Sequence, residues 1–109
     1  MFELPVIDAQ IRDIAPGFIA MSIHVDATNA RAGQLPGNLL EEASGYVVRG
    51  GPSWAEAHLT SWADAYQRFG AKPNRTPCSA QALRKRVLKD GKLPPINPLV
   101  DLYNAVSLK

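Results

Sequence analysis

The sequence predicts an α+β protein in which several helices pack on a small sheet that this chain only partly supplies. Residues 18–26 alternate apolar with small or polar side chains, a pattern typical of a strand. Most of the remaining chain shows helical spacing with recognisable start and stop signals. Isolated strands and two-stranded ribbons are marginal in water, so such a strand needs partners. Either a second polypeptide or another copy completes the sheet, or the chain is an incomplete copy of a larger domain.

Length and composition are ordinary for one soluble domain, which we expect to span residues 1–109. Of the 109 residues, 46% are hydrophobic and 20% charged, and the net charge is +2. A mildly basic chain is compatible with a nucleic-acid partner without indicating one. The single cysteine, Cys78, excludes an internal disulfide and suits a reducing compartment. Because neither a leader nor an apolar segment of spanning length is apparent, we expect a cytoplasmic protein without membrane contact.

The N-terminal third is predicted to contain two strands and one helix. Residues 1–4 could form a short strand, and residues 5–14 have an apolar side typical of a helix that Pro16 and Gly17 end. In the second strand, alternate residues face one way: Ile19, Met21, Ile23 and Val25. His24 lies on the opposite, more polar face, where it could carry a proton or be structural.

Two helices are predicted in the middle of the chain, after a loop over residues 28–37. Asn38 with Glu41 resembles a capping box for a helix reaching residue 49, although residues 46–48 also have strand character. Ser53 with Glu56 forms a second capping box, for a helix ending at Gly70. Its aromatic residues favour a place in the core, with stacking on RNA as the alternative: Trp62, Tyr66 and Phe69.

The next helix is predicted to begin at Thr76-Pro77 and to end at Gly91. Its apolar residues recur at helical spacing and are expected to be buried: Ala80, Leu83, Val87 and Leu88. Lys85, Arg86 and Lys89 point the opposite way, either as an ordinary solvated face or as a surface that contacts phosphates. Arg84 falls inside the apolar arc, so its guanidinium must either extend to solvent or pair with an acid, for which Asp101 is a candidate.

The last helix is predicted to begin at Asn97-Pro98 and to run to Lys109. A core stripe is expected on one side: Leu99, Leu102, Tyr103 and Val106. Asp101, Asn104 and Ser107 form a separate polar line, which is either an outer surface or a grip for the ammonium or hydroxyl group of a ligand.

Several sequence patterns that mark nucleotide and metal enzymes are absent. We find no phosphate-binding glycine loop, no dinucleotide-binding fingerprint, no H-E-x-x-H and no G-x-S-x-G. Two histidines and one cysteine do not make a structural zinc site without carboxylates. Cys78 has no evident base beside it in the sequence, which disfavours a nucleophile. We therefore expect no cofactor and no metal.

Three segments resemble the B3/B4 domain, the tRNA-binding and editing domain of the phenylalanyl-tRNA synthetase beta subunit, which also occurs as free-standing proteins. The segments are residues 62–73, 79–88 and 93–108, and the last contains the pattern I-N-P-x-V-D-x-x-N. The similarity is nearest to the free-standing form and strongest over residues 54–109. It implies an α+β domain, here only its N-terminal half, with helices on a sheet.

The resemblance also implies a function. The synthetase domain hydrolyses tyrosine wrongly attached to the phenylalanine tRNA, chiefly by positioning water and stabilising an oxyanion. By the match, Asn104 and Tyr103 would lie at the amino-acid pocket and Asp101 would support their helix. Tyr103 departs from the threonine usual there, and the editing histidine and glutamate would both fall beyond Lys109. The expected function is tRNA binding, together with the hydrolysis of mischarged tRNA that the relationship to the synthetase domain implies. The alternative is a non-catalytic RNA-binding or interaction module.

Overall fold

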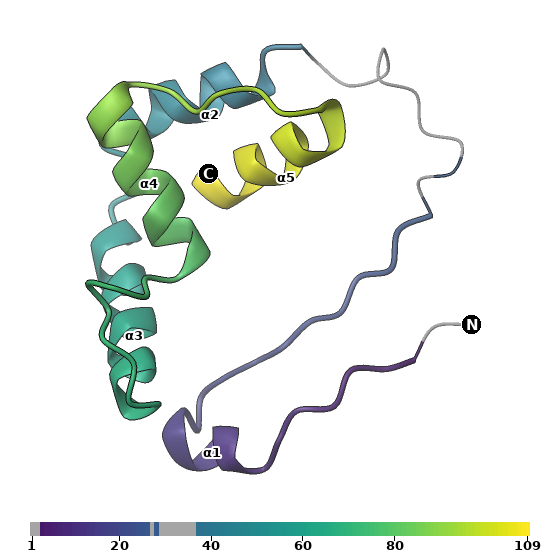
Figure 1. Ribbon diagram of the computed structural model, residues 1–109, viewed down its shortest axis with the longest axis vertical. Coiled ribbons are helices and arrows are strands. Elements are labelled where there is room, and N and C mark those ends of the chain that lie inside the picture. The colour runs from purple at the N-terminus through teal and green to yellow at the C-terminus, as the bar shows by residue number, and fades with distance from the viewer. Residues whose placement is uncertain (1–2, 27, 29–36) are drawn as a thin grey trace.

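The computed structural model describes residues 3–26, 28 and 37–109, and α-helix is the only regular secondary structure in this part of the chain (Figure 1). The helices are α1 (Gln10–Ile14), α2 (Leu39–Val48), α3 (Ala55–Arg68), α4 (Ser79–Asp90) and α5 (Pro98–Leu108). No described residue belongs to a strand, so the predicted α+β class is wrong. None of the helices in the described residues is long and apolar enough to cross a membrane.

The predicted strand over residues 18–26 is an extended segment without sheet partners. Its alternating apolar side chains are largely exposed, from 72% at Val25 to 88% at Ile19. Alternation favours an extended backbone, but a strand also needs a neighbour to accept and donate its backbone hydrogen bonds, and the described residues provide none. Residues 3 and 4 of the other predicted strand are also non-strand, and residues 1–2 lie outside the described part, as does most of the loop expected at 28–37.

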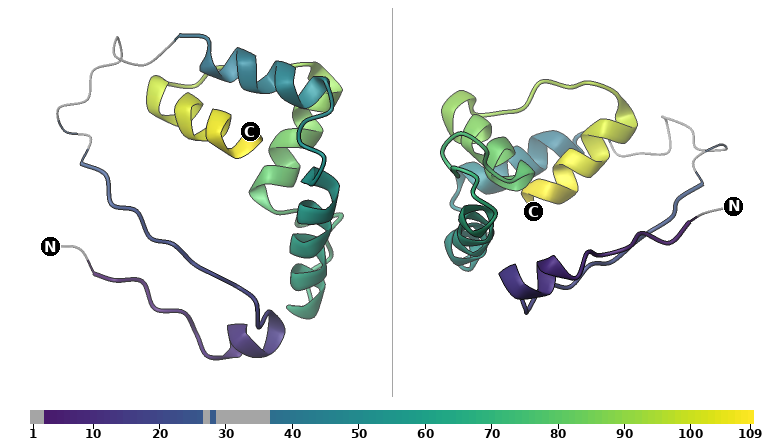
Figure 2. Two further views of the ribbon diagram at one scale, coloured as in Figure 1. Left: turned by 180° about the vertical axis from the view of Figure 1, so that it is seen from behind. Right: turned by 60° about the horizontal axis from the view of Figure 1, so that its bottom comes forward.

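The core lies where α2, α4 and α5 pack on one another (Figures 1 and 2). Val87 of α4 is fully buried at its centre, as the spacing predicted. The other buried apolar residues come from α2, α5 and the link before α5: Ala43, Val47, Leu93, Ala105 and Leu108. Leu88, in contrast, is half exposed, so its predicted burial is wrong.

On α5 the sequence predicted the wrong core face. Ala105 and Leu108 are buried, whereas Leu99, Tyr103 and Val106 are more than half exposed. The apolar residues of α5 cover most of its circumference, so spacing alone does not decide which side meets α2 and α4. Ala105 and Leu108 belong to one buried cluster with Ala43 and Val47 of α2 and Val87 of α4.

Local signals at the ends of α4 and α5 are partly confirmed. Asn97 caps α5, its Oδ1 accepting from the Val100 N–H at 2.9 Å, with Pro98 in the first turn. Gly91 ends α4 with a φ of 80°, a left-handed conformation that favours glycine. The expected start at Thr76-Pro77 is wrong, because α4 begins at Ser79 after an extended Cys78.

The two predicted capping boxes do not form. Asn38 precedes α2 as expected, but its Nδ2 donates to Glu42 Oε1 at 2.8 Å and its side chain does not cap the backbone. The helix predicted from Ser53 begins instead at Ala55, after Trp54, again without a side-chain cap. A capping box needs a specific side-chain rotamer at both ends, which the sequence pattern permits without enforcing.

Helices α1 and α3 lie beside the core without contributing to it. Helix α1 has only five residues, shorter than the predicted 5–14, and none of its residues is buried. No residue of α3 is buried either, so the expected core role of its aromatic stripe is wrong. Aromatic rings contact each other edge-on along α3, beginning with Phe18 against Trp62. Arg68 Nη1 donates to the Ile14 carbonyl at 2.8 Å and ties α1 to α3.

Candidate functional site

Positive charge is concentrated in one part of the chain. Residues 68–92 hold eight of the twelve lysines and arginines, and the only acid among them is Asp90. This segment spans the end of α3, the loop that follows, α4 and the first turn beyond it. A chain of small net charge therefore carries a strongly basic region.

Helix α4 displays three of these cations on its solvent side. Lys85, Arg86 and Lys89 are exposed, while Val87 between them points into the core. Arg86 Nε lies 3.8 Å from Asp90 Oδ2, an exposed pair one helical turn apart that holds the guanidinium only weakly.

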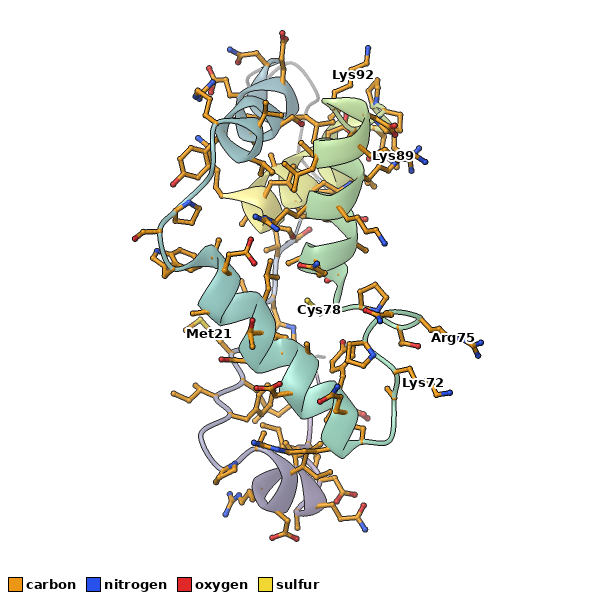
Figure 3. The ribbon with its side chains drawn as sticks, turned by 90° about the vertical axis from the view of Figure 1, so that its left-hand side faces the viewer. Met21, Lys72, Arg75, Cys78, Lys89 and Lys92 are labelled. Carbon is orange, nitrogen blue, oxygen red and sulfur yellow. The ribbon has the colours of Figure 1, made fainter. Side chains whose placement is uncertain are left out.

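Three further cations extend this side of the molecule. Lys72 and Arg75 come from the loop before α4, and Lys92 follows its C-terminal glycine. Figure 3 shows Lys72, Arg75, Lys89 and Lys92 projecting along one side of the molecule. We call these six exposed cations the basic face: Lys72, Arg75, Lys85, Arg86, Lys89 and Lys92. The sequence pattern indicated only its three central members, because the other three are joined to it by the fold.

Arg84 belongs to a different environment. Its Nη2 lies 2.6 Å from Glu56 Oε1 of α3, so the expected pair with Asp101 is wrong. Asp101 instead accepts the Ile96 N–H at 2.9 Å and holds the proline-rich link against the start of α5. The correct partner of Arg84 could not be inferred, because the sequence does not show that the N-terminal turn of α3 lies against α4.

The three predicted pocket residues of α5 differ in exposure and in their surroundings. Asp101 and Asn104 are half-buried, and Tyr103 is more than half exposed. Asp101 lines a hollow of about 680 Å³ between α2, the link and α5. Neither Tyr103 nor Asn104 contributes to the wall of that hollow. Their role at an amino-acid pocket remains a prediction.

Comparison with protein families places the second half of the chain. Residues 61–109 match the family model of the B3/4 domain. The match is a little under half of the chain, and no curated protein and no solved structure matches it.

The matched segment contains most of the candidate residues. It includes the end of α3, all of α4 and α5, the whole basic face and the three residues predicted at the pocket. It leaves out α1, α2 and the extended segment before them. The match to the B3/4 domain therefore covers the basic half of the molecule, while the exposed apolar segment over residues 18–25 lies outside it.

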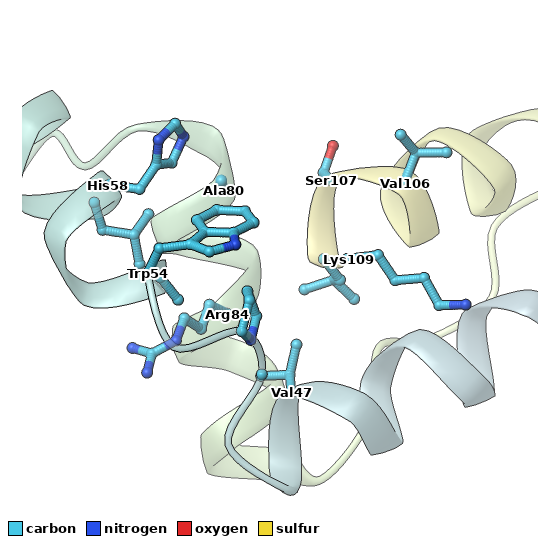
Figure 4. A pocket seen from close by; sticks show the side chains of 13 residues that line it. Val47, Trp54, His58, Ala80, Arg84, Val106, Ser107 and Lys109 are labelled. Carbon is cyan, nitrogen blue, oxygen red and sulfur yellow. The ribbon is translucent and has the colours of Figure 1, made fainter.

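A second hollow, of about 250 Å³, was not predicted from the sequence (Figure 4). It lies where the end of α2, the start of α3, α4 and the end of α5 meet, and Trp54, Ala80 and Val106 are among its mainly apolar walls. The His58 ring lies edge-on to Trp54, and His58 Nε2 is 3.3 Å from Trp62 Nε1, which donates. Burial of Val106 was expected, so no hollow beside it could be foreseen.

Two further candidate residues, Cys78 and His24, come from separate segments of the chain. Cys78 is half-buried at the start of α4, and His24 Nε2 lies 3.3 Å from Ser22 Oγ in the exposed extended segment. Within the described residues, no three side chains of the metal-binding types lie close enough to share an ion.

Among the residues that the structure describes, the Asp26 carboxyl has a pKa below its ordinary value. Hydrogen bonds from the hydroxyl and then the backbone N–H of Thr28 lower the pKa of the Asp26 carboxyl, because they stabilise its charged form. The carboxyl is fully exposed, so this is a local turn on the surface.

Proposed function

We propose that this protein binds tRNA through the basic face, as a B3/4-type domain of the kind found in the phenylalanyl-tRNA synthetase beta subunit. The observation that supports the proposal most directly is the concentration of charge over residues 68–92 within the segment that matches the B3/4 domain. A cytoplasmic location is part of the proposal, and the single cysteine favours it.

The dimensions of the basic face suit a nucleic-acid backbone. Its cations lie along α4 and beyond both ends of this 12-residue helix, which at 1.5 Å per residue is ~18 Å long. Phosphates of one duplex strand advance by ~3.4 Å, so the helix is about as long as five base-pair steps. Exposed lysines and arginines at such positions displace condensed counterions, which favours association at low salt.

Salt-dependent binding tests the proposal. We would measure the affinity for unfractionated tRNA by fluorescence anisotropy between 50 and 200 mM salt. If all six cations contact phosphates, the affinity falls about 10³-fold over this range, with a slope near −5 on logarithmic axes. Changing Lys85, Arg86 and Lys89 to Gln removes three contacts and reduces the magnitude of the slope by about 3.

The control is Arg12→Gln, which removes one exposed charge from α1, away from the basic face. It should leave the slope unchanged, and circular dichroism should show native helix content in both variants. An unaltered slope in the triple variant would refute the basic face as the binding surface. Failure of the unmodified protein to bind tRNA would refute the function itself.

Whether hydrolysis accompanies binding depends on α5. By resemblance, Asn104 and Tyr103 lie at the amino acid of a charged tRNA, and half-buried Asn104 has an amide able to hold it. A panel of mischarged tRNAs separates the two functions. Turnover that Asn104→Ala abolishes while tRNA binding persists indicates a deacylase, and binding without turnover indicates an RNA-binding module.

A further inference from the structure

Two apolar surfaces of this molecule have no described partner. The first, which we call the arm stripe, consists of four alternating residues of the extended segment: Ile19, Met21, Ile23 and Val25. All four are at least 72% exposed. Such a row of large apolar side chains in water is unfavourable, and contiguous patches of this kind mark interaction sites.

The second surface, the α5 stripe, lies on the side of α5 that faces away from the core. Leu99, Tyr103 and Val106 recur at i, i+4 and i+7, so they form one line along the helix. They are 54% to 69% exposed, whereas Ala105 and Leu108 on the other side are buried. Figure 1 shows that α5 and the extended segment border the same open side of the molecule.

The α5 stripe leads into the hollow of about 250 Å³ beside Val106. Figure 4 shows the Trp54 ring within this region, between α4 and the end of α5. An apolar cavity of ~150 Å³ is enough to hold a benzene-sized group, so this hollow has room for an aliphatic side chain. The second surface therefore offers both a ridge and a recess.

We propose that two copies of this chain associate by exchanging arms, so that the arm stripe of each copy packs along the α5 stripe of the other. Each copy carries both stripes, so a two-fold symmetric dimer buries all four stripes at the same time. The α5 stripe is ~11 Å long and the arm stripe ~20 Å, so about three arm side chains can lie over the three of the α5 stripe. At ~60–120 Å² each, the twelve side chains of the two contacts bury on the order of 1,000 Å², the lower limit for a specific interface.

The structure also indicates why the arm does not cover the α5 stripe of its own copy. The base of the arm is held against the second half of α3, where Phe18 packs edge-on against Trp62, with ring centroids 6.2 Å apart. The adjoining helix α1 is tied there by the hydrogen bond from Arg68 to Ile14. From this base the arm extends without burying its apolar residues.

Charge complementarity gives the contact a direction. Asp26 directly follows the arm stripe, on the opposite face of the extended segment, and the hydrogen bonds from Thr28 stabilise its charged form. Lys109 is part of the hollow's rim at the end of α5. An arm whose Val25 lies near Val106 of the other copy brings Asp26 close to Lys109, whereas the reverse direction separates them.

The oligomeric state tests the proposal. Sedimentation equilibrium of the full chain, without RNA, should give about twice the monomer mass of 11.8 kDa. Ile23→Asp and Val106→Asp should each raise the dimer dissociation constant at least tenfold. Leu88→Asp is the matched control. Leu88 is an apolar residue of α4 that is half exposed but belongs to neither stripe, so this substitution should leave the dimer intact.

Disulfide trapping distinguishes exchange from other dimers. In a Cys78→Ser background, a tagged Ile23→Cys chain mixed with an untagged Val106→Cys chain should yield a cross-linked heterodimer on mild oxidation. A monomer at 100 µM would overturn the proposal. So would a dimer insensitive to both aspartate substitutions, or a chain with both cysteines that forms the disulfide within a monomer.

Discussion

Truncating Val87 to alanine tests which residues form the core. The substitution removes two methyl groups from a fully buried side chain, at ~0.8 kcal/mol each. The ~50 Å³ left behind adds about 1 kcal/mol at ~24 cal/mol per Å³, and the better helix propensity of alanine offsets about 0.5 kcal/mol. We expect a loss of about 2 kcal/mol.

The assay is urea unfolding followed by the helical circular dichroism signal. With a slope of ~1–2 kcal/mol per molar urea, the midpoint should fall by about 1–2 M. Leu88→Ala is the comparison. Leu88 is next to Val87 on α4 but is half exposed, so its truncation should cost less than about 1 kcal/mol. The sequence pattern predicts burial of both residues, so equal losses would refute the packing described here.

Three further measurements probe separate parts of the structure. Asn97→Ala removes the cap of α5 and should cost about 1 kcal/mol in thermal unfolding, most of which Asn97→Asp should retain. A double-mutant cycle on Arg84 and Glu56 should give a coupling below about 1 kcal/mol, since the Glu56 side chain is 77% exposed and the pair is screened; a larger value would mean that the pair is shielded from water. Thr28→Val should raise the pKa of Asp26 in an NMR titration. Because that pKa is lowered in the folded chain, the stabilisation it reflects is present above the ordinary carboxyl pKa and lost as the pH falls through the folded value.

The sequence predicted features that depend on a few neighbouring residues. Asn97 with its following proline marks the start of α5, and Gly91 marks the end of α4, because each signal acts within one turn of helix. Burial of Val87 also followed from spacing, since the apolar arc of α4 is narrow and its opposite side is strongly basic.

Features that depend on distant neighbours were not predictable. Val106 and Ala105 are adjacent apolar residues, and the packing of α5 on α2 and α4 decides that the smaller one is buried. The acidic partner of Arg84 depends on how α3 lies against α4. Residues 18–26 have the alternation of a strand, but a sheet requires a second segment, which the described residues lack.

The candidate site also contains some features that local sequence predicts and others that depend on the fold. Exposure of the central cations of α4 follows from helical periodicity, whereas Lys72 and Arg75 join the basic face only because the loop before α4 brings them there. For Asn104 and Tyr103 the resemblance suggests a role, and the geometry shows only that neither lines the hollow beside Asp101.

Because α3 has no buried residue, it should unfold before the rest of the protein. Amide protons of α3 should exchange with solvent through subglobal openings that cost less free energy than whole-molecule denaturation. Those of α4 around Val87 should exchange only when the cooperative unit of α2, α4 and α5 melts. Helix α3, the aromatic residues along it and the arm that packs on it would then unfold together as one unit of low stability, while α2, α4 and α5 stay folded.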